Sequence, residues 1–367
     1  MSLVVPVSYG GSPCYEIHLE RDFCSLLPCI QALGYQPQRK VCVISDSNVA
    51  PLYLEEICCL LEAHFSLCTS YVFEAGEASK HTGTVGQVYE HLIQNRFDRK
   101  DLLVALGGGV VGDLTGFAAA TYLRGIDFIQ IPTSLLAQVD SSIGGKTGVD
   151  FLQYKNMVGA FYMPRLVYMN LSVLHSLPKA HLSSGMGEII KHGQIKDSAY
   201  FQWLMDHQEE ILSGDLGALE EMVYGSCRIK GDVVQRDPKE QGERALLNFG
   251  HTIGHAVEKL SDFSLLHGEC VALGMVAAAE LSCRYGSYAG SDLRQLKETI
   301  AAFGLPLSLS QANVQGFTPE QVLEATKLDK KMDGGSVKFI LLQRVGEAYI
   351  TRELSDAQIL EGIRCLF

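Results

Sequence analysis

The feature that most constrains the fold is an apolar run that ends in a glycine-rich turn, DLLVALGGGVVGDLTGF, at residues 101–117. The run itself predicts a strand, and the residues after the turn have the pattern of a helix. A strand that is apolar throughout is normally buried on both of its faces, which is typical of a parallel sheet covered by helices. The stretch therefore favours an α/β domain.

Other segments of the first half repeat this pattern. Short apolar runs at residues 40–47, 68–75, 127–133 and 165–170 end at Gly, Asp, Pro or Asn and predict further strands. Helix-like stretches lie between several of them, at residues 51–65 and 84–97. This alternation predicts a mostly parallel sheet with covering helices.

The pattern changes after Leu177 and Pro178, because helical periodicity then dominates to about residue 330. Residues 337–354 predict a β-hairpin with a glycine in its turn. We therefore expect two domains, an α/β nucleotide-binding domain at residues 1–177 and a mostly helical domain at residues 178–367 that binds metal and substrate.

Composition excludes several classes of function. The net charge of −12 argues against a general nucleic-acid or membrane-surface role, so an anionic ligand needs a local cluster of basic residues. The first residues lack the pattern of a signal peptide, and the apolar stretch at 270–279 is too short to cross a bilayer. Eleven scattered cysteines without a Cys-x-x-Cys pair indicate reduced thiols, so we expect a soluble cytoplasmic protein.

The glycine turn has the spacing Gly107-x-Gly109-x-x-Gly112 between a predicted strand and a predicted helix. Glycines there let the backbone approach a pyrophosphate, which the helix N-terminus then binds. The acidic residue expected some twenty residues later is missing, and the acid at a strand end is Asp46, upstream of the turn. The motif indicates a dinucleotide in a non-standard order, and a tight strand–helix turn is the alternative.

The stretch SSIGGKTGVD is not a phosphate-binding loop, since position 140 is Asp where that motif requires Gly. It leaves Lys146 in a glycine-flanked polar turn, with Asp140, Lys155 and Asn156 nearby in the sequence. A solvated loop is the alternative interpretation.

Two helices carry candidate metal ligands. Glu188, Lys191 and His192 share one helix face, and the flanking glycines and methionine are unusual for a plain surface ion pair. His251 and His255 have the His-x-x-x-His spacing of zinc sites. His267 follows within seventeen positions, and the spacing does not decide which histidines bind.

Several motifs in order resemble the 3-dehydroquinate synthase family of the sugar-phosphate cyclases. They are GGGVVGDLTGFAAATYLRG, IPTSLLAQVDSSIGGKTGVD, KNMVGAF, GMGEIIKHG and LLNFGHTIGHAVE with HGE. The resemblance runs from VISDSN at 43–48 to the DKK at 329–331. It implies conversion of 3-deoxy-D-arabino-heptulosonate 7-phosphate to 3-dehydroquinate and phosphate in the shikimate pathway. The implied route is transient oxidation by NAD, phosphate elimination, re-reduction, ring opening and aldol closure.

The resemblance also implies functions for individual residues. The ligands of a zinc or cobalt ion would be Glu188, His251 and His267, with His255 left to handle protons near the substrate. NAD contacts would be Asp46, Asn48, Glu77, Lys80, Gly108, Gly109, Val110, Val111, Gly112, Asp113, Thr133, Ser134, Lys146, Lys155 and Ser176. Substrate contacts would be Asp140, Lys146, Asn156, Lys191, Lys230, Arg244, Asn248 and His255.

Two implied features concern partners and the C-terminal region. Arg124 would reach the phosphate bound by the neighbouring subunit of a homodimer. One of Lys330, Lys331 and Lys338 would contact the substrate, and the sequence leaves open which.

Three rival functions are distinguished by their chemistry. A metal-dependent alcohol or polyol dehydrogenase would share the glycine turn and the metal, but it needs fewer cations and would release NADH. A sister sugar-phosphate cyclase would form a different ring from a similar substrate. A non-catalytic homologue would have no reason to retain all three metal-ligand types.

Overall fold

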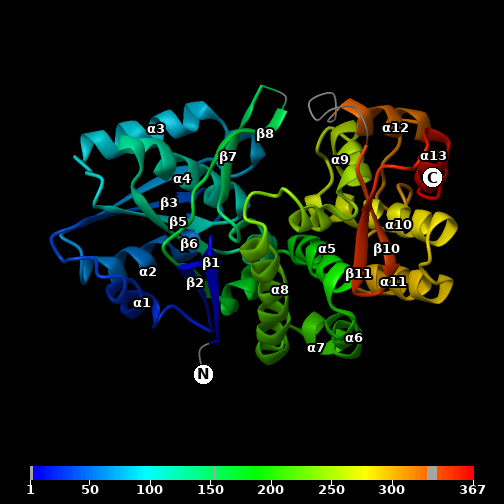
Figure 1. Cartoon of the computed structure of the whole chain (residues 1–367). Coiled ribbons are helices and arrows are strands. Elements are labelled where there is room, and N and C mark those ends of the chain that lie inside the picture. Colours follow the sequence, from blue (N-terminus) through cyan, green and yellow to red (C-terminus); the bar gives the residue numbers. More distant parts are fainter. Residues whose placement is uncertain (1–2, 153, 329–336) are drawn as a thin grey trace. The chain divides into compact units, whose positions relative to one another are not determined.

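The computed structural model describes residues 3–152, 154–328 and 337–367. The chain divides into two compact units, unit 1 (Met1–Leu177) and unit 2 (Pro178–Phe367). In Figure 1 unit 1 runs from blue to green and unit 2 from green to red.

Unit 1 is built on a seven-stranded sheet with the order β1-β2-β9-β6-β5-β3-β4. Strands β1 and β2 pair antiparallel, and the other neighbours are parallel, which confirms the predicted sheet. The strands are β1 (Leu3–Tyr9), β2 (Ser12–Glu20), β3 (Lys40–Asp46), β4 (Leu67–Phe73), β5 (Leu102–Gly107), β6 (Asp127–Pro132) and β9 (Val167–Asn170).

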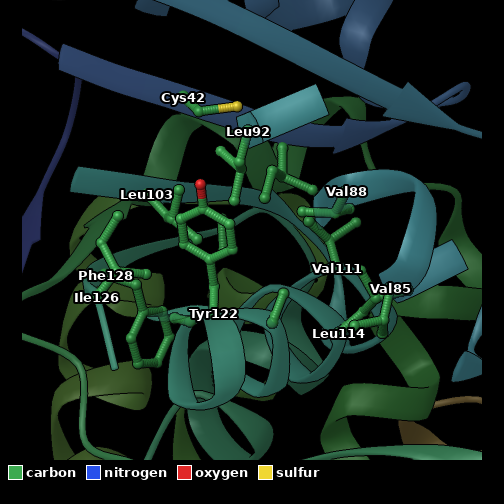
Figure 2. Close-up of a cluster of buried hydrophobic side chains, with 14 of the residues drawn as sticks. Cys42, Val85, Val88, Leu92, Leu103, Val111, Leu114, Tyr122, Ile126 and Phe128 are labelled. Carbon is green, nitrogen blue, oxygen red and sulfur yellow. The ribbon is translucent and has the colours of Figure 1, made fainter. Parts of the chain in front are cut away.

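Helices cover both faces of this sheet. On one face α3 (Thr82–Gln94) and α4 (Gly109–Thr121) pack on Cys42 and Ile44, in the cluster that Figure 2 shows. On the other, α1 (Leu26–Ala32) and α2 (Ala50–Glu62) pack on Val41 and Val43. Successive residues of β3 thus enter different cores, which is why the inner strands are apolar at every position.

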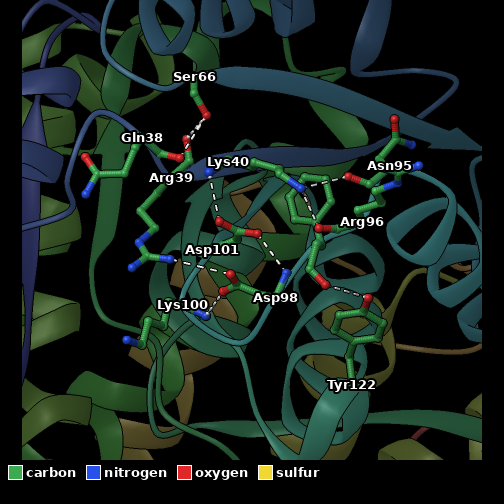
Figure 3. Close-up of polar contacts among 11 residues, drawn as sticks. Gln38, Arg39, Lys40, Ser66, Asn95, Arg96, Asp98, Lys100, Asp101 and Tyr122 are labelled. Atoms are coloured by element: carbon green, nitrogen blue, oxygen red, sulfur yellow. Dashed lines mark hydrogen bonds and ion pairs between the residues drawn. The ribbon is translucent and has the colours of Figure 1, made fainter.

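Polar contacts tie the amino ends of β3 and β5 together (Figure 3). The buried carboxylate of Asp101 accepts hydrogen bonds from the backbone amides of Lys40 (2.9 Å) and Asp98 (2.8 Å). The Lys40 ammonium donates to the carbonyls of Asn95 and Arg96 just after α3. These contacts lie at the opposite edge of the sheet from the glycine turn, so they stabilise the sheet and leave its carboxyl edge to the candidate site.

Two hairpins of unit 1 were not predicted. One is β1–β2, and the other pairs β7 (Lys146–Phe151) with β8 (Tyr154–Phe161). Lys146 is therefore the first residue of a strand, and the prediction that it lies in a polar turn was wrong. The turn is at Gly144 and Gly145, whose φ angles are +100° and +62°. Glycines obscure the alternation that would have revealed β7 and β8.

Unit 2 is mostly helical, as predicted. Its apolar helix α10 (His267–Tyr285) packs against α5, α9, α11, α13 and β10, which is why the stretch at 270–279 is so apolar. The predicted hairpin at the C-terminal end is β10 (Phe339–Arg344) with β11 (Glu347–Thr351). The other elements are α5 (Lys179–Lys196), α6 (Ser198–Asp206), α7 (Gln208–Ser213), α8 (Leu216–Arg236), η5 (Glu243–Asn248), α9 (His251–Leu260), α11 (Gly290–Ala302), α12 (Pro319–Leu328) and α13 (Asp356–Arg364). Among the described residues no helix is both long and apolar enough to cross a membrane.

Candidate active site

Three side chains of unit 2 converge on one point from three helices. Glu188 comes from the middle of α5, His251 begins α9 and His267 begins α10. The Glu188 Oε1 atom lies 3.5 Å from the His251 Nε2 atom and 3.6 Å from the His267 Nε2 atom. Their ligand atoms all lie within 4.8 Å of one another, so these side chains could hold a metal ion.

Glycines let the three helices approach closely enough for this convergence. A Cβ atom on Gly268 would stand 1.8 Å from the carbonyl oxygen of Ser184 on α5. One on Gly274 would stand 1.8 Å from the carbonyl oxygen of Gly250, just before α9. Backbone therefore packs against backbone on both sides of α10. The glycines beside the histidines have this packing function, which their position in the sequence did not reveal.

Without a cation, Glu188 and His251 have the protonation states that bind one, whereas His267 must first release a proton. Burial alone would raise the pKa of Glu188, but the Lys191 ammonium and the imidazoles of His267 and His251 hold it well below its usual range. Burial and the charge of Lys191 lower the pKa of His251 well below its ordinary value, so its ring is neutral. Burial would also lower the pKa of His267, but the nearby carboxylates of Glu188 and Glu258 raise it to about 9.

The donor set fits a divalent metal on two observations. The completely buried Glu188 Oε1 atom has no hydrogen-bond partner within the described chain. The His251 Nδ1 atom lies 3.2 Å from the carbonyl oxygen of Phe249, so Nδ1 carries the proton and Nε2 presents a lone pair toward Glu188. A carboxylate oxygen and an imidazole lone pair that face each other repel, and a bound cation removes that repulsion.

A second candidate group shares His267. It consists of His255, Glu258 and His267, and the exposed His255 ring has its centroid 5.1 Å from that of His251. No three-ligand group in the described part of the chain contains both His251 and His255. The geometry thus separates the two histidines that share the His-x-x-x-His spacing.

Basic side chains of unit 2 lie buried around the Glu188 helix. Lys191 is 1% exposed and forms a short ion pair with Glu188. Lys230 on α8 and Arg244 on η5 are also buried, and α5, α8 and η5 pack against one another. The Arg244 guanidinium donates to the carbonyl of Pro238 at 2.7 Å. A chain with a net charge of −12 thus holds three buried cations in one group of packed elements.

The segment before α9 is held by two acidic residues that the sequence analysis did not select. The Glu240 carboxylate accepts a 2.7 Å hydrogen bond from the side-chain amide of Asn248. Glu243 pairs with Lys196 on α5 and lies 2.7 Å from Arg236 on α8. Their only signal in the sequence is the charged stretch DPKEQGER at 237–244.

Of the three C-terminal lysines, Lys338 precedes β10, and its backbone carbonyl accepts a hydrogen bond from the Thr252 hydroxyl at 3.3 Å. Lys330 and Lys331 lie outside the described residues.

The Glu243 ion pairs predict an acid-sensitive contribution to stability. Hydrogen bonds from Arg236, with the charge of Lys196, outweigh partial burial and lower the pKa of Glu243 to about 2. A lowered folded-state pKa stabilises the fold above the unfolded-state pKa, and the contribution is lost as pH falls from about 4.3 toward 2. Because Glu243 is partly exposed, we expect Glu243→Gln to cost about 1 kcal/mol at pH 7 and less than half of that at pH 3. Urea unfolding at both pH values measures this; an equal cost at both would contradict it.

In unit 1 the glycine turn connects β5 directly to α4. Gly108 is the N-cap of α4, and its missing side chain leaves the backbone at the helix start accessible. A Cβ atom on Gly109 would stand 3.1 Å from the Ser141 Oγ atom, and one on Gly112 would stand 2.9 Å from the Gln130 Oε1 atom. The amide of Thr133 donates to the carbonyl of Gly107, so β6 ends beside the turn. Other members of the predicted NAD set near this edge are Val110, Val111 and Ser134.

Several predicted NAD residues form one polar cluster around Lys80. Its ammonium, 5% exposed, lies 2.7 Å from Asp113 and 3.9 Å from Glu77, and it donates to the Asn156 Oδ1 atom at 2.6 Å. Lys155 lies 3.9 Å from the same Glu77 carboxylate. Burial would lower the pKa of Lys80, but the carboxylates of Asp113 and Glu77 raise it above its usual value. The cluster connects the start of α4 to the β7–β8 hairpin.

The remaining predicted residues of unit 1 lie at several positions. Asp46 ends β3, and its carboxylate accepts hydrogen bonds from the amides of Asn48 and Val49, each at 2.9 Å. Ser176 pairs with the hydroxyl of Tyr53 at 2.5 Å. Asp140 lies in the π-helical turn Ala137–Ser141, Lys146 begins β7 and Arg124 is exposed on η2 (Tyr122–Arg124).

Comparison with solved structures gives the class of fold, since the similar structures are two synthases and a dehydrogenase. The chain is similar over its whole length to 2-deoxy-scyllo-inosose synthase complexed with carbaglucose-6-phosphate, NAD⁺ and Co²⁺, with 25% identity, 100% of both chains covered and a TM-score of 0.87. It is similarly close to 2-epi-5-epi-valiolone synthase from Streptomyces hygroscopicus with NAD⁺ and Zn²⁺ bound, with 26% identity, 99% of both chains covered and a TM-score of 0.86. The butanol dehydrogenase of Thermotoga maritima shares the fold alone, at 14% identity, 98% of both chains covered and a TM-score of 0.71.

Sequence comparison then gives the family. The model of the 3-dehydroquinate synthase N-terminal region matches residues 70–184, and the model of its C-terminal region matches residues 185–332. The chain is 42% identical over 356 residues to a 3-dehydroquinate synthase of Nitrosospira multiformis, covering 97% of this chain and 95% of the relative. The chain therefore belongs to the 3-dehydroquinate synthase family.

Proposed function

We propose that this chain is a 3-dehydroquinate synthase, which converts 3-deoxy-D-arabino-heptulosonate 7-phosphate to 3-dehydroquinate and phosphate. The observation that carries the proposal is the set of buried cations on α5, which carries Glu188, and on the elements α8 and η5 that pack against it. Lys191, Lys230 and Arg244 are each less than 10% exposed. Such cations stabilise a phosphate or carboxylate through charge-assisted hydrogen bonds in a site that excludes water.

Glu188, His251 and His267 would hold a divalent cation, zinc or cobalt, in unit 2. The orphaned Glu188 Oε1 atom and the lone pair of His251 Nε2 support this assignment over His255. When bound, such a cation supplies Lewis acidity toward a substrate hydroxyl. The exposed His255 imidazole would then exchange protons with the substrate, since it lies beside the ligands without belonging to their group.

NAD would be held by unit 1. The start of α4 offers backbone amides to a pyrophosphate, and the Lys80 cluster and Asp46 lie near the same edge of the sheet. The chemistry that NAD supplies when bound is reversible hydride acceptance. Thr133, Ser134, Lys155 and Ser176 would complete the binding residues, and Asp140, Lys146 and Asn156 would contact the substrate.

Two further assignments concern assembly and location. The chain would act as a homodimer, in which Arg124 serves the neighbouring subunit; its exposure on η2 supports this role. A cytoplasmic location would agree with the eleven cysteines, none of which forms a disulfide.

A turnover assay with limiting NAD tests the proposed function. Product and phosphate together have the oxidation level of the sugar phosphate, so the hydride must return to the molecule that lost it. We expect substoichiometric NAD to support many turnovers, with phosphate accumulating and no steady rise in NADH absorbance. One NADH formed per substrate consumed would identify a dehydrogenase, the second candidate, whose fold this chain shares.

A further inference from the structure

The two imidazoles of the proposed metal site differ in what lies next to the Nδ1 atom, the ring nitrogen that faces away from Glu188. The His251 Nδ1 atom lies 3.2 Å from a backbone carbonyl oxygen, that of Phe249. The His267 Nδ1 atom faces the carboxylate of Glu258, with the Oε2 atom 4.0 Å away. Both Nε2 atoms point to Glu188. The Phe249 carbonyl is thus within hydrogen-bond distance of the His251 ring, whereas the Glu258 carboxylate faces the His267 ring at ion-pair distance.

We propose that Glu258 is a positioning residue that keeps the His267 proton on Nδ1, so that Nε2 presents its lone pair to the divalent cation. The inference rests on the proposed function for the identity of the ligands. It assigns Glu258 a role outside both the ligand set and the substrate contacts.

In the form that binds a cation, the His267 imidazole has lost its second proton and is neutral, so it can exist as either of two tautomers. A proton on Nε2 would point at the proposed cation and prevent coordination, whereas a proton on Nδ1 leaves Nε2 able to bind. Histidines that bind metals usually donate their other N–H to a carboxylate, a carbonyl or water, which orients the ring and makes the ligand more basic. Glu258 is only 6% exposed, so water screens its charge toward His267 weakly.

The helices explain why a carboxylate is available there. Glu258 follows His251 by seven residues on α9, about two helical turns, so both side chains lie on the same face. That face packs against α10, which begins at His267. Gly254 allows the approach, because a Cβ atom there would stand 2.6 Å from the Cys270 carbonyl oxygen. One helix therefore supplies a ligand at its first residue and a carboxylate for the other ligand two turns later.

Cation affinity of the metal-free protein tests the proposal without relying on turnover. Glutamine keeps the shape of Glu258 but removes the charge that attracts the Nδ1 proton. We expect Glu258→Gln to bind Zn²⁺ about 10 to 100 times more weakly, measured by competition with a chromophoric chelator. We also expect it to shift the visible absorption bands of bound Co²⁺, which report on the ligands, whereas a loss of fold stability alone would leave these bands in place.

Glu269→Gln is the matched control. Glu269 lies two residues from His267, but its carboxylate accepts a 2.8 Å hydrogen bond from the Leu266 amide, which a glutamine oxygen can also accept. The Glu269→Gln variant should keep its Zn²⁺ affinity within about threefold of the unaltered protein. That change is smaller than the weakening of at least about 10-fold expected when a metal ligand loses its partner. Circular dichroism of both metal-free variants shows whether each is folded.

Three results would overturn the proposal. The first is a folded Glu258→Gln variant with unchanged Zn²⁺ affinity and an unchanged Co²⁺ spectrum. The second is two cations bound by the unaltered protein and one by the variant, since Glu258 would then be a ligand of a second ion with His255 and His267. The third is no cation binding by the unaltered protein, which would refute the ligand set itself. Failure of phosphate release with normal affinities would instead refute only the proposed reaction.

Discussion

Replacing Glu188, His251 or His267 with alanine is expected to remove the divalent cation and to lower the turnover rate at least about 1000-fold, because each would supply one of the three proposed protein ligands. The Glu188 variant also leaves the buried Lys191 ammonium without its counter-ion, so it should be the least stable of the three. Elemental analysis of the purified proteins measures the cation, and phosphate release measures the rate.

His255→Ala is the comparison that gives this result its meaning. Its ring lies beside that of His251 but outside the three-ligand group, so the variant should keep the cation and turn over slowly. Should His255→Ala lose the cation as completely as His251→Ala does, the ligand assignment is wrong and the simple His-x-x-x-His pair is the site.

Gly268→Ala destabilises unit 2 by about 3 kcal/mol or more and prevents cation binding. The new Cβ atom would stand 1.8 Å from the Ser184 carbonyl oxygen, and neither backbone can move without separating α5 from α10. That separation would also move Glu188 away from His267. Thermal unfolding measures the first effect, and chelator competition measures the second.

Gly290→Ala is the matched change for this prediction. Gly290 begins α11, and a Cβ atom there would meet nothing within 4 Å. Its stability should stay within about 0.5 kcal/mol of the unaltered protein. If Gly268→Ala unfolds at the same temperature as Gly290→Ala, the close packing of α5 on α10 is not what holds the ligands together.

The sequence by itself determined five of the seven strands in the sheet of unit 1 and the residue types of the site. Apolar runs such as residues 102–107 predict strands that are covered on both faces, since burial depends on side chains that the sequence shows directly. The order of motifs likewise identified the family before any geometry was known. The hairpins β1–β2 and β7–β8 were missed, because they include glycines and partly exposed strands whose alternation is weak.

Only the tertiary structure decided how the candidate ligands are arranged. Spacing alone made a pair of His251 and His255 possible, because residues four apart share a helix face, but it did not decide which histidines bind. The family resemblance implied Glu188, His251 and His267 without their geometry. The arrangement of α5, α9 and α10 instead brings Glu188, His251 and His267 together, and it directs Glu258 toward the outer nitrogen of His267. This arrangement depends on contacts in which a glycine lies directly against the backbone of another segment. Ser184 and Gly268, for example, are in contact although they are 84 residues apart in the sequence. A local pattern cannot encode such contacts, because they depend on which helices meet and at what distance.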